Sequence, residues 1–472
     1  MGYHAETLAQ YVCNLSYGDL PKRVVQQAKW CILDCLGVSL AGCQTAWAKS
    51  VLDLTRDQGG KEEATIYYYG DRTSSANAAL ANSVFAHSVD FDDDLAVCHT
   101  GAIATPTALA IGERVAADGR DLITAVVLGY DIATRVADAL DAENVYLRGL
   151  QPTALCGPFA AAAIAGKLLH LSEEEMAHAF GIAASFSGGT VEFLKHGTDT
   201  KRLYPGKGAM GGIVAALLAQ TGMTGPKSIF EGEQGFLKAH SASSQPAKLI
   251  QDLGARYDIL DVSIKRFPFC DGIAAPFEAI IHIIEENDLG PDDIADIKAK
   301  IKSFLYLVVD HRGDPQRTFP PKTVLDAQLS LPFCAAVGIL NGGDIFLDDF
   351  RADVFTDARV LDLAKRIKAE PDPELDKIPY RPMSMPAVVT LTTTGGKSFE
   401  KRVDYQKGDP RNPFEEKDYH AKFSRCASTV LSEDRVEELI ALVSDLERLA
   451  NVSELAGKLV GEDHLGQRAA HQ

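Results

Sequence analysis

Small residues crowd the apolar segments in the first half of the chain, and this feature limits the possible folds more than any other. The stretches TPTALAIGERVAA, GPFAAAAIAGKLLHL and KGAMGGIVAALLAQTG are all rich in alanine and glycine. Side chains of this size let neighbouring helix axes approach closely. Strand patterns are almost absent before residue 255. We therefore predict a large domain of closely packed helices.

Four segments predict individual helices from their end signals or their spacing. PKRVVQQAKWCILDCLGVSLAG has a proline at its start, apolar residues at intervals of three to four, and a glycine at its end. LSEEEMAHAFGIAAS and TGPKSIFEG each open with a capping or turn residue, which predicts that a helix follows. SEDRVEELIALVSDLERLA keeps its apolar positions at helical spacing.

The pattern changes in the second half of the chain. IADIKAKIKSFLYLVVD begins to alternate apolar with polar residues, and PAVVTLTTTGGKSFEKRVDY predicts a hairpin of two strands around Gly395 and Gly396. We therefore predict a mainly α large helical domain, residues 1–265 plus 410–472, with an inserted smaller α+β domain, residues 266–409. Because the chain would cross between the domains twice, we expect the smaller domain to act as a hinged lid.

The net charge argues against two classes of partner. The 472 residues include 47 basic and 65 acidic side chains, which gives a formal net charge of -18 at pH 7. A field of this sign repels nucleic acid and anionic membrane surfaces, so we expect neither as a partner. An anionic small molecule would need a local cluster of basic residues.

The sequence predicts a cytoplasmic protein. It has no segment of transmembrane length and no basic and apolar signal sequence at its start. Its nine cysteines are scattered and odd in number, as expected of free thiols in a reducing compartment. No three of them have the spacing of ligands to an iron–sulfur cluster.

The segment AHSVDFDDDLAVCHTG gathers charge between two helical stretches. Its histidines and aspartates are His87, Asp90, Asp92, Asp93, Asp94 and His99. Neighbouring carboxylates repel one another, and aspartate prefers caps and turns to helix interiors. Two interpretations stay open. The cluster is either an acidic first turn of the following helix on a solvated surface, favoured by the helix dipole, or one half of a site.

The segment KHGTDTKRLYPGKGAMGG is basic in an otherwise acidic protein. Its main functional groups are Lys195, His196, Lys201, Arg202, Tyr204 and Lys207, with Asp199 as the one acidic residue. Its glycines and proline predict a loop that leads into a helix, and the free N–H groups at the start of that helix would favour an anion. The segment is then either a carboxylate or phosphate site or an ordinary basic surface loop.

Two shorter segments add candidates. SIKRFPFCDG places Lys265 and Arg266 at the predicted domain boundary, either as cations that move with a lid or as part of a charged linker. The same segment contains Cys270 and Asp271. LRGLQPTALCGPFAAAA places Gln151 at the mouth of a buried helix, where helix capping alone would explain it.

Three functions fit these segments. The first is acid–base chemistry on a di- or tricarboxylate, in which basic residues hold the carboxylates and an aspartate–histidine pair moves protons. The second is a magnesium-dependent helical isoprenoid synthase, because DFDDD has the composition of a metal box, although a convincing second box is missing. The third is a non-catalytic carboxylate-binding protein, which would leave the aspartate cluster unexplained.

The chain resembles the MmgE/PrpD family, which includes 2-methylcitrate dehydratase, cis-aconitate decarboxylase and iminodisuccinate epimerase. The resemblance covers nearly the whole chain. It rests on AHSVDFDDD followed by His99, PTALCGPFAAAAIAGKLLHLS, TKRLYPGKGAMGGIVAALLAQTGMTGPKSIFEGEQGF, IKRFPFCDG and KGDPRNPFEEKDYHAKF. It implies an enzyme without a metal or other cofactor, usually a homodimer, with a large helical domain, a small α+β lid and the active site between them.

The resemblance also implies catalytic residues. Asp90 and His99 match the aspartate and histidine of the family's active site, and Lys201 matches its lysine. Removing a proton next to a carboxylate places negative charge on that carboxylate, so nearby cations stabilise the transition state. His99 can act as acid or base if Asp90 holds it in one tautomer. The expected cations are Lys201, Lys207 and Arg266.

Four positions depart from the family and leave the source of a second proton open. Gln151 stands where many members have a histidine, and it can hold a carboxylate or hydroxyl but cannot act as an acid. Tyr204 replaces another histidine and is the first candidate for the second proton. Cys270 lies near a position that is histidine in the decarboxylase, and Asp94 occupies a position that is often Thr or Ser. Both are weaker candidates.

We therefore predict a lyase or isomerase that performs metal-free acid–base chemistry on a small polycarboxylate as a homodimer. Dehydration of a 2-methylcitrate-like acid is the first reaction considered, followed by decarboxylation of a cis-aconitate-like acid and epimerisation of an iminodisuccinate-like acid. The predicted catalytic residues are Asp90, His99, Lys201 and Tyr204. The predicted substrate-binding residues are Gln151, Lys207, Lys265, Arg266, Cys270 and Asp94.

Overall fold

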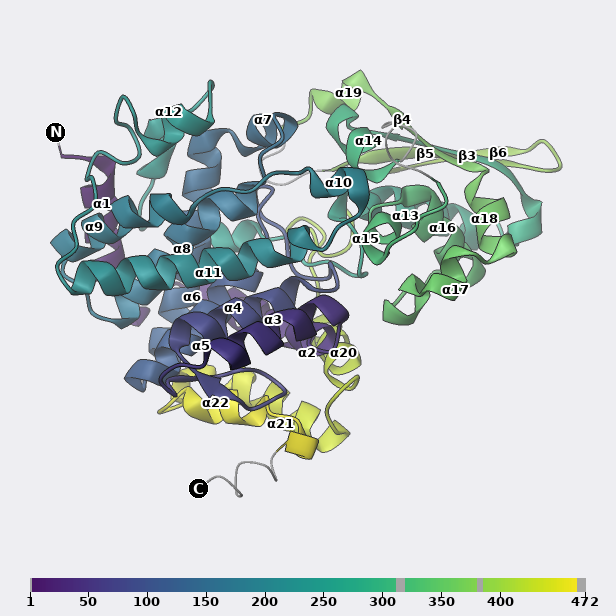
Figure 1. Cartoon of the computed structure of the whole chain (residues 1–472). Helices are drawn as coiled ribbons and strands as arrows, with labels where there is room; N and C mark the ends of the chain where they lie inside the picture. The colour runs from purple at the N-terminus through teal and green to yellow at the C-terminus, as the bar shows by residue number, and fades with distance from the viewer. Residues whose placement is uncertain (1, 311–318, 380–384, 465–472) are drawn as a thin grey trace.

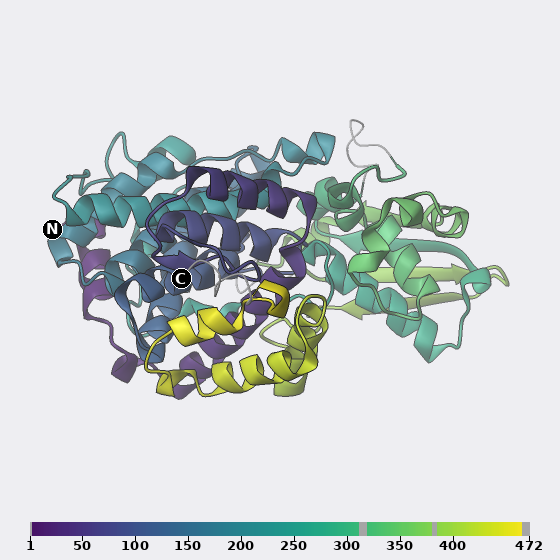
Figure 2. The same ribbon diagram turned by 60° about the horizontal axis from the view of Figure 1, so that its bottom comes forward.

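The computed structural model describes residues 2–310, 319–379 and 385–464. Figure 1 shows a larger helical part at the left and a smaller part with a β-sheet at the right. Figure 2, turned about the horizontal axis, shows the same two parts side by side. Most of the regular structure in the described residues is helical, as the mainly α prediction expects.

The larger part is built from helices at both ends of the chain. The helices of the N-terminal segment are α1 (His4–Asn14), α2 (Lys22–Gly42), α3 (Ala46–Gln58), α4 (Ser75–His87), α5 (Gly101–Val115), α6 (Gly119–Leu140), α7 (Ala142–Leu147), α8 (Pro152–Leu168), α9 (Glu173–Ala183), α10 (Phe193–His196), α11 (Thr200–Gln220) and α12 (Phe236–His240). The helices of the C-terminal segment are α20 (Glu416–Ala427), α21 (Glu433–Ser444) and α22 (Ser453–Lys458). Two short strands, β1 (Ala64–Thr65) and β2 (Arg72–Thr73), pair antiparallel.

Helices α8 and α11 pack against each other through their small residues. An added Cβ at Gly208 of α11 would lie 3.2 Å from the Cα of Gly157 in α8. One turn further along both helices, an added Cβ at Gly212 would lie 2.4 Å from the Cβ of Ala161. The predicted close helix packing is therefore confirmed. Because the contacts advance in the same direction on both helices, α8 and α11 are parallel and their N-terminal ends lie at the same end of the bundle.

Three of the four predicted helices are present, and one is not. Helix α2 starts directly after Pro21, Ser172 caps α9, and α21 lies inside the predicted C-terminal segment. The segment TGPKSIFEG forms turns instead, and α12 begins only at Phe236. Gly225 in this segment packs so closely on α9 that an added Cβ would lie 2.5 Å from the carbonyl oxygen of His178. The segment thus packs against α9 as an irregular chain and does not form the predicted helix.

The smaller part combines a four-stranded sheet with helices. Its strands are β3 (Ile294–Ile301), β4 (Ile367–Pro371), β5 (Ala387–Thr393) and β6 (Ser398–Val403), in the order β4-β3-β5-β6. Strands β3 and β4 are parallel, and the other two pairs are antiparallel. The β5–β6 pair confirms the predicted hairpin, with Gly396 at a φ of 81° in its turn. Its helices are α13 (Ala274–Glu286), α14 (Ser303–Val309), α15 (Val324–Gln328), α16 (Leu331–Leu340), α17 (Ala352–Phe355), α18 (Ala358–Ala364) and α19 (Pro373–Asp376).

Each part has its own apolar core. One cluster of buried side chains joins residues 5–264 with residues 414–459, and the other lies mainly in residues 267–403. Phe193 of α10 belongs to the second cluster, so the larger part contributes to the core of the smaller one. The predicted domain boundaries and the role of the smaller part as a lid stay predictions.

Within residues 2–310, 319–379 and 385–464, no single helix is both long enough and apolar enough to cross a membrane. Helices α2 and α3 meet these requirements only as a pair, and they are bent by 92° where they join.

Candidate active site

The aspartates of the acidic segment lie in the loop between α4 and α5, and all are buried. None of the four is more than 7% exposed: Asp90, Asp92, Asp93 and Asp94. The interpretation as a solvated acidic turn is therefore wrong. Only Asp93 serves the helix, because its Oδ1 accepts a hydrogen bond from the N–H of Gly101, the first residue of α5, at 2.9 Å. The hydroxyl of Tyr130 donates to the other oxygen of Asp93.

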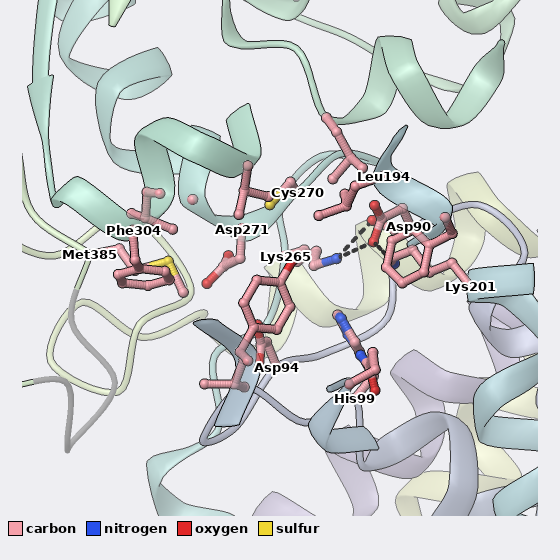
Figure 3. A pocket seen from close by; sticks show the side chains of 18 residues that line it. Asp90, Asp94, His99, Leu194, Lys201, Lys265, Cys270, Asp271, Phe304 and Met385 are labelled. Carbon is pink, nitrogen blue, oxygen red and sulfur yellow. Dashed lines mark hydrogen bonds and ion pairs between the residues drawn. The ribbon is translucent and has the colours of Figure 1, made fainter. Parts of the chain in front are cut away.

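Asp90 pairs with two lysines from distant segments. Its Oδ1 accepts hydrogen bonds from Lys201 Nζ at 3.0 Å and from Lys265 Nζ at 2.8 Å (Figure 3). Lys201 lies in the first turn of α11, and Lys265 lies in the segment that leads into the smaller part. Burial alone would raise the pKa of the Asp90 carboxyl, but the two ammonium groups hold that pKa well below its usual range. Asp90 is therefore a carboxylate that fixes two cations.

Asp92, and not Asp90, holds the two histidines. Asp92 Oδ2 lies 2.8 Å from His87 Nδ1 and 3.4 Å from His99 Nδ1. The expected pairing of Asp90 with His99 is wrong, because the lysines take up the Asp90 carboxylate. His87 Nδ1 carries a proton and donates a hydrogen bond to Asp92. Its Nε2 is therefore unprotonated and accepts a hydrogen bond from Lys201 Nζ at 3.1 Å.

His99 leaves one ring nitrogen for the cavity. Its Nδ1 donates to the carbonyl oxygen of Asp93 at 2.9 Å, so Nε2 is unprotonated in the neutral ring. Burial lowers the pKa of His99 well below its usual value, and the Asp92 carboxylate offsets this only in part. Burial lowers the pKa of His87 to about 4 in the same way. Both rings are neutral near pH 7, and His99 Nε2 can act as a base.

These charged groups form one wall of a cavity that also contacts the smaller part of the molecule (Figure 3). The polar side chains that line it are Asp90, Asp94, His99, Gln151, Lys201, Lys265, Cys270 and Asp271. The remaining, mainly apolar lining is Val97, Tyr146, Phe193, Leu194, Gly272, Phe304, Leu305, Val308, Leu329 and Met385. Converging polar groups beside an apolar wall are typical of a small-molecule site.

A second pair of carboxyl groups lines the same cavity. The backbones of Asp94 and Ser263 exchange two hydrogen bonds of 3.0 and 2.9 Å, and Ser263 Oγ donates to Asp271 Oδ2 at 3.4 Å. Burial raises the pKa of Asp271 to about 6. Burial, together with the neighbouring Asp271, raises the pKa of Asp94 well above its usual value. Among the residues that the structure describes, Asp94 Oδ1 has no hydrogen-bond partner.

Gln151 and Cys270 line the cavity in forms that exchange no proton near pH 7. Gln151 Oε1 caps α8 by accepting from the N–H of Ala154 at 2.9 Å, and its Nε2 donates to Thr153 Oγ1 at 3.3 Å. The same Thr153 oxygen accepts from the N–H of His99 at 3.0 Å, which ties α8 to the acidic loop. Burial raises the pKa of the Cys270 thiol to about 12.

Seven of the ten predicted site residues meet at this cavity. They are Asp90, Asp94, His99, Gln151, Lys201, Lys265 and Cys270. They come from the acidic loop, the N-terminal ends of α8 and α11, and the segment between Lys265 and Cys270. The parallel packing of α8 and α11 explains why two of these segments arrive at the same place.

Three predicted site residues do not line the cavity. Helix α11 already begins at Thr200, so the basic segment is mostly helical and not the predicted loop. Along that helix the side chains turn away from the cavity: the Tyr204 hydroxyl donates to the Thr190 carbonyl at 2.6 Å, and Lys207 Nζ donates to the Gly188 carbonyl at 2.6 Å. The Arg266 guanidinium lies over the ring of Phe267, 5.0 Å from its centre, and lines a separate groove.

The list of predicted site residues left out four side chains that line the cavity or contact the acidic loop: His87, Asp92, Asp271 and Gln328, whose Nε2 donates to the carbonyl oxygen of Val89. The first three lie inside segments that the sequence singles out, so their spacing was the available signal. Gln328 of α15 has no such signal, because its neighbours in LDAQLSLPF are mostly apolar. Only the fold brings its side chain to the acidic loop.

His87, Asp92 and His99 are also the one set of three ligand-type side chains, among the described residues, whose ligand atoms lie within 4.8 Å of one another. Asp92 already forms a hydrogen bond with His87 Nδ1 at 2.8 Å, and the Nδ1 proton of His99 bonds to the Asp93 carbonyl oxygen. The Lys201 ammonium at 3.1 Å from His87 Nε2 would repel a cation. The three side chains therefore lie together as a cluster whose Nδ1 atoms are already engaged by protein oxygens.

Comparisons with known proteins find relatives along the whole chain. The sequence model of the MmgE/PrpD N-terminal domain matches residues 6–248, and that of the MmgE/PrpD C-terminal domain matches residues 267–448. Cis-aconitate decarboxylase of Homo sapiens is 30% identical over 97% of this chain and 94% of its own length. Cis-aconitate decarboxylase-like protein oryM of Aspergillus oryzae is 26% identical over 96% of this chain and 97% of its own. Cis-aconitate decarboxylase of Aspergillus terreus is 25% identical over 95% and 94%.

Proposed function

The chain belongs to the MmgE/PrpD family of enzymes, and we propose that it is a metal-free lyase that decarboxylates a small unsaturated polycarboxylate. The observation that carries this proposal is the two-sided cavity, in which Lys201 and His99 lie at one end and the apolar Phe304 and Met385 at the other (Figure 3). The names of the relatives support decarboxylation over the dehydration that the sequence analysis considers first.

The charged wall has room for one substrate carboxylate. A lysine ammonium group has three donors. Lys201 uses two of them, on Asp90 Oδ1 and His87 Nε2, and Lys265 uses two, on the carbonyl oxygen and Oδ1 of Asp90. One N–H of each lysine is left for a carboxylate. The same two cations would stabilise the negative charge that develops when a neighbouring C–C bond breaks.

The apolar wall favours the loss of a second carboxylate. Phe304, Leu305 and Val308 of α14 have no donor in their side chains to offer an anion. A carboxylate facing them is poorly solvated, whereas CO2 is neutral, so the departure of CO2 relieves an unfavourable contact. The substrate would place its retained carboxylate toward Lys201 and Lys265 and its leaving carboxylate toward α14.

Dehydration is the second candidate because of one specific observation. His99 is neutral with Nδ1 bonded to the Asp93 carbonyl, which makes Nε2 a base that can remove a proton next to a carboxylate. A 2-methylcitrate-like or similar hydroxy acid would then need an acid to assist the departing hydroxyl.

Incubation with a panel of small acids in heavy water separates these reactions. We expect an aconitate-like acid to release CO2 and to give a product that carries deuterium on carbon. Gas analysis detects the CO2, and NMR detects the deuterium. Alkene formation from a citrate-like acid without CO2 release would indicate a dehydratase. Deuterium exchange into an amino-dicarboxylate without alkene formation or CO2 release would indicate an epimerase. No exchange and no turnover with any acid would contradict the lyase and favour a carboxylate-binding protein. Loss of activity with a chelator would contradict the metal-free chemistry.

Substitutions test the charged wall. His99→Ala and Lys201→Ala should each reduce kcat at least about 10²-fold while the circular dichroism spectrum stays unchanged. Lys207→Ala on the same helix is the matched control and should keep most of the activity, because Lys207 bonds to Gly188 away from the cavity. Full activity of both His99→Ala and Lys201→Ala would contradict the site assignment.

We also propose a cytoplasmic homodimer, as the family resemblance implies. All nine cysteines are free, which fits a reducing compartment. Light scattering on the purified protein should give twice the mass of one chain, and a single-chain mass would contradict the dimer.

A further inference from the structure

We infer that Asp94 is the general acid of this enzyme and that Asp271 is a positioning residue that keeps Asp94 protonated. The inference rests on the proposed lyase function and names the group that gives the product its proton. Such a group is needed because decarboxylation leaves an electron pair on carbon, which must take up a proton.

The other polar groups at the cavity are poor sources of this proton. Neutral His99 has its proton on Nδ1, where it bonds to the Asp93 carbonyl. Gln151 has no acidic proton, and the Cys270 thiol has a pKa raised to about 12 by burial. Tyr204, the first candidate from the sequence, bonds to the Thr190 backbone outside the cavity. Asp94 remains.

The surroundings of Asp94 favour a neutral carboxyl group. It is 7% exposed, lines the cavity, and has no hydrogen-bond partner for Oδ1 among the described residues. A buried carboxyl without donors, placed beside other carboxyls, keeps its proton. Lys265 is a cation that acts on Asp94, but Lys265 is already bonded twice to Asp90. The other charged groups that act on Asp94 are Asp92, Asp93 and Asp271.

Asp271 is the charged member of the pair. Its Oδ2 accepts hydrogen bonds from Gln406 Nε2 at 3.2 Å and from Ser263 Oγ at 3.4 Å, and such donors favour a carboxylate. Ser263 also holds the backbone of Asp94, so the two carboxyls are fixed relative to each other. Figure 3 shows both side chains among those that line the cavity. A carboxylate at Asp271 disfavours a second charge at Asp94, and so the proton stays on Asp94.

The bond between the substrate carbon and its leaving carboxylate breaks, CO2 departs, and the electron pair stays on the carbon and spreads into the neighbouring unsaturated carboxylate held by Lys201 and Lys265. The O–H bond of Asp94 then breaks and a C–H bond forms. Asp94 becomes a carboxylate next to Asp271, and their repulsion favours uptake of a proton from water, which restores the acid. The net reaction consumes one proton and releases one CO2.

Steady-state kinetics of three variants test the roles of both residues. Asp94→Asn and Asp94→Thr should each reduce kcat about 10²- to 10⁴-fold, while the substrate dissociation constant from calorimetry changes less than about threefold. Asp271→Asn removes the charge that keeps Asp94 protonated, so the fall of kcat with rising pH should move to lower pH. Asp348→Asn, an exposed carboxyl with a side chain 88% exposed, is the matched control and should leave both the rate and the pH profile unchanged.

Two outcomes would overturn the inference. One is a kcat of Asp94→Asn or Asp94→Thr within about threefold of the wild type, since neither side chain can act as an acid. The other is an unchanged pH profile in Asp271→Asn, because a merely structural role for Asp271 would alter the rate without moving that profile.

A measurement without substrate separates this inference from the proposed function. In protein with ¹³C-labelled aspartate, NMR should detect a carboxyl that is still protonated at pH 7 in the wild type and missing in Asp94→Asn. If that signal is found but no acid is turned over, the proposed lyase function is wrong, whereas the inference of a protonated Asp94 beside a charged Asp271 is supported. If every carboxyl that titrates above pH 6 persists in Asp94→Asn, the pair is wrong whatever the reaction.

Discussion

At the scale of single residues, Asp90 and Asp92 hold different partners although they are two positions apart. Asp90 neutralises Lys201 and Lys265, and Asp92 faces the Nδ1 atoms of His87 and His99. The backbone accounts for the difference, since Asp90 has a φ of 54°, in the left-handed region, which turns the chain between the two side chains. One carboxylate fixes the cations, and the other orients the histidines.

Asp92→Asn and Asp90→Asn should therefore fail in different ways. Asp92→Asn leaves the lysines paired but weakens the hydrogen bond to His87 and removes the negative charge beside His99, so we expect kcat to fall about 10²- to 10⁴-fold with substrate binding retained. Asp90→Asn leaves two buried ammonium groups without a carboxylate, which should lower the free energy of unfolding by about 3–5 kcal/mol. Kinetics and urea unfolding check the two effects. Two results together would contradict this assignment and favour the predicted pairing of Asp90 with His99. They are a normal kcat in Asp92→Asn and, in Asp90→Asn, a reduced kcat with an unchanged free energy of unfolding.

The pH dependence of stability tests Asp271. Burial raises the pKa of Asp271 from 3.8 to about 6, so its stabilising contribution is fully present below pH 3.8 and is lost as the pH rises through about 6. Asp271→Asn lacks this contribution at every pH. The free energy of unfolding of the variant, relative to the wild type, should therefore rise by about 3 kcal/mol between pH 3.5 and pH 8. Urea unfolding across this range measures the difference, and a flat or falling difference would contradict the raised pKa.

At the scale of elements, the site depends on how α8 and α11 pack. Their contacts at Gly157, Ala161, Gly208 and Gly212 keep the helices parallel and close, and this places Gln151 and Lys201 at one end. The alanine- and glycine-rich pattern predicted the close packing, because small side chains are visible in the sequence.

The rotation of α11 about its axis was not predictable in the same way. Lys201, Tyr204 and Lys207 recur at helical spacing, and the sequence indicates no preference for one of them at the cavity. The prediction also placed them in a loop, since Pro205 and the glycines suggest one. In the structure Pro205 lies inside α11, and only Lys201 reaches Asp90. The sequence could thus predict which segments reach the cavity. Which side chain of each segment lines the cavity depends on the helix packing, which the sequence pattern does not show.

Gly212→Ala should disturb this packing. The added Cβ would lie 2.4 Å from the Cβ of Ala161 and 2.5 Å from two backbone atoms of α8, so the helices must separate. We expect the free energy of unfolding to fall by about 1–3 kcal/mol. Gly457→Ala in α22 is the control, because nothing lies within 4 Å of its added Cβ, and it should be neutral or stabilising by up to about 1 kcal/mol. Thermal unfolding compares the two, and equal effects would contradict the close contact.

At the scale of the whole molecule, Gln328 joins the smaller part to the charged wall. It lies on α15 and is 1% exposed. Its Nε2 donates to the carbonyl oxygens of Val89 at 2.7 Å and Pro268 at 3.1 Å, and its Oε1 accepts from the guanidinium of Arg202. Val89 directly precedes Asp90, so this amide links the position of the acidic loop to the smaller part.

Gln328→Glu tests whether this link needs an amide. A glutamate would gain a charge pair with Arg202, which on its own predicts stabilisation. It would also place a carboxylate oxygen against two carbonyl oxygens that have lost their donor, and buried acceptors without a donor cost about 1–3 kcal/mol each. We expect the second effect to dominate, because burial also removes the water that could replace the donor. The free energy of unfolding should fall by about 2–4 kcal/mol, and KM should rise as the acidic loop loosens.

Gln220→Glu, exposed at the end of α11, is the matched control and should stay within about 0.5 kcal/mol of the wild type. A more stable Gln328→Glu would mean that the Arg202 charge pair outweighs both carbonyl contacts.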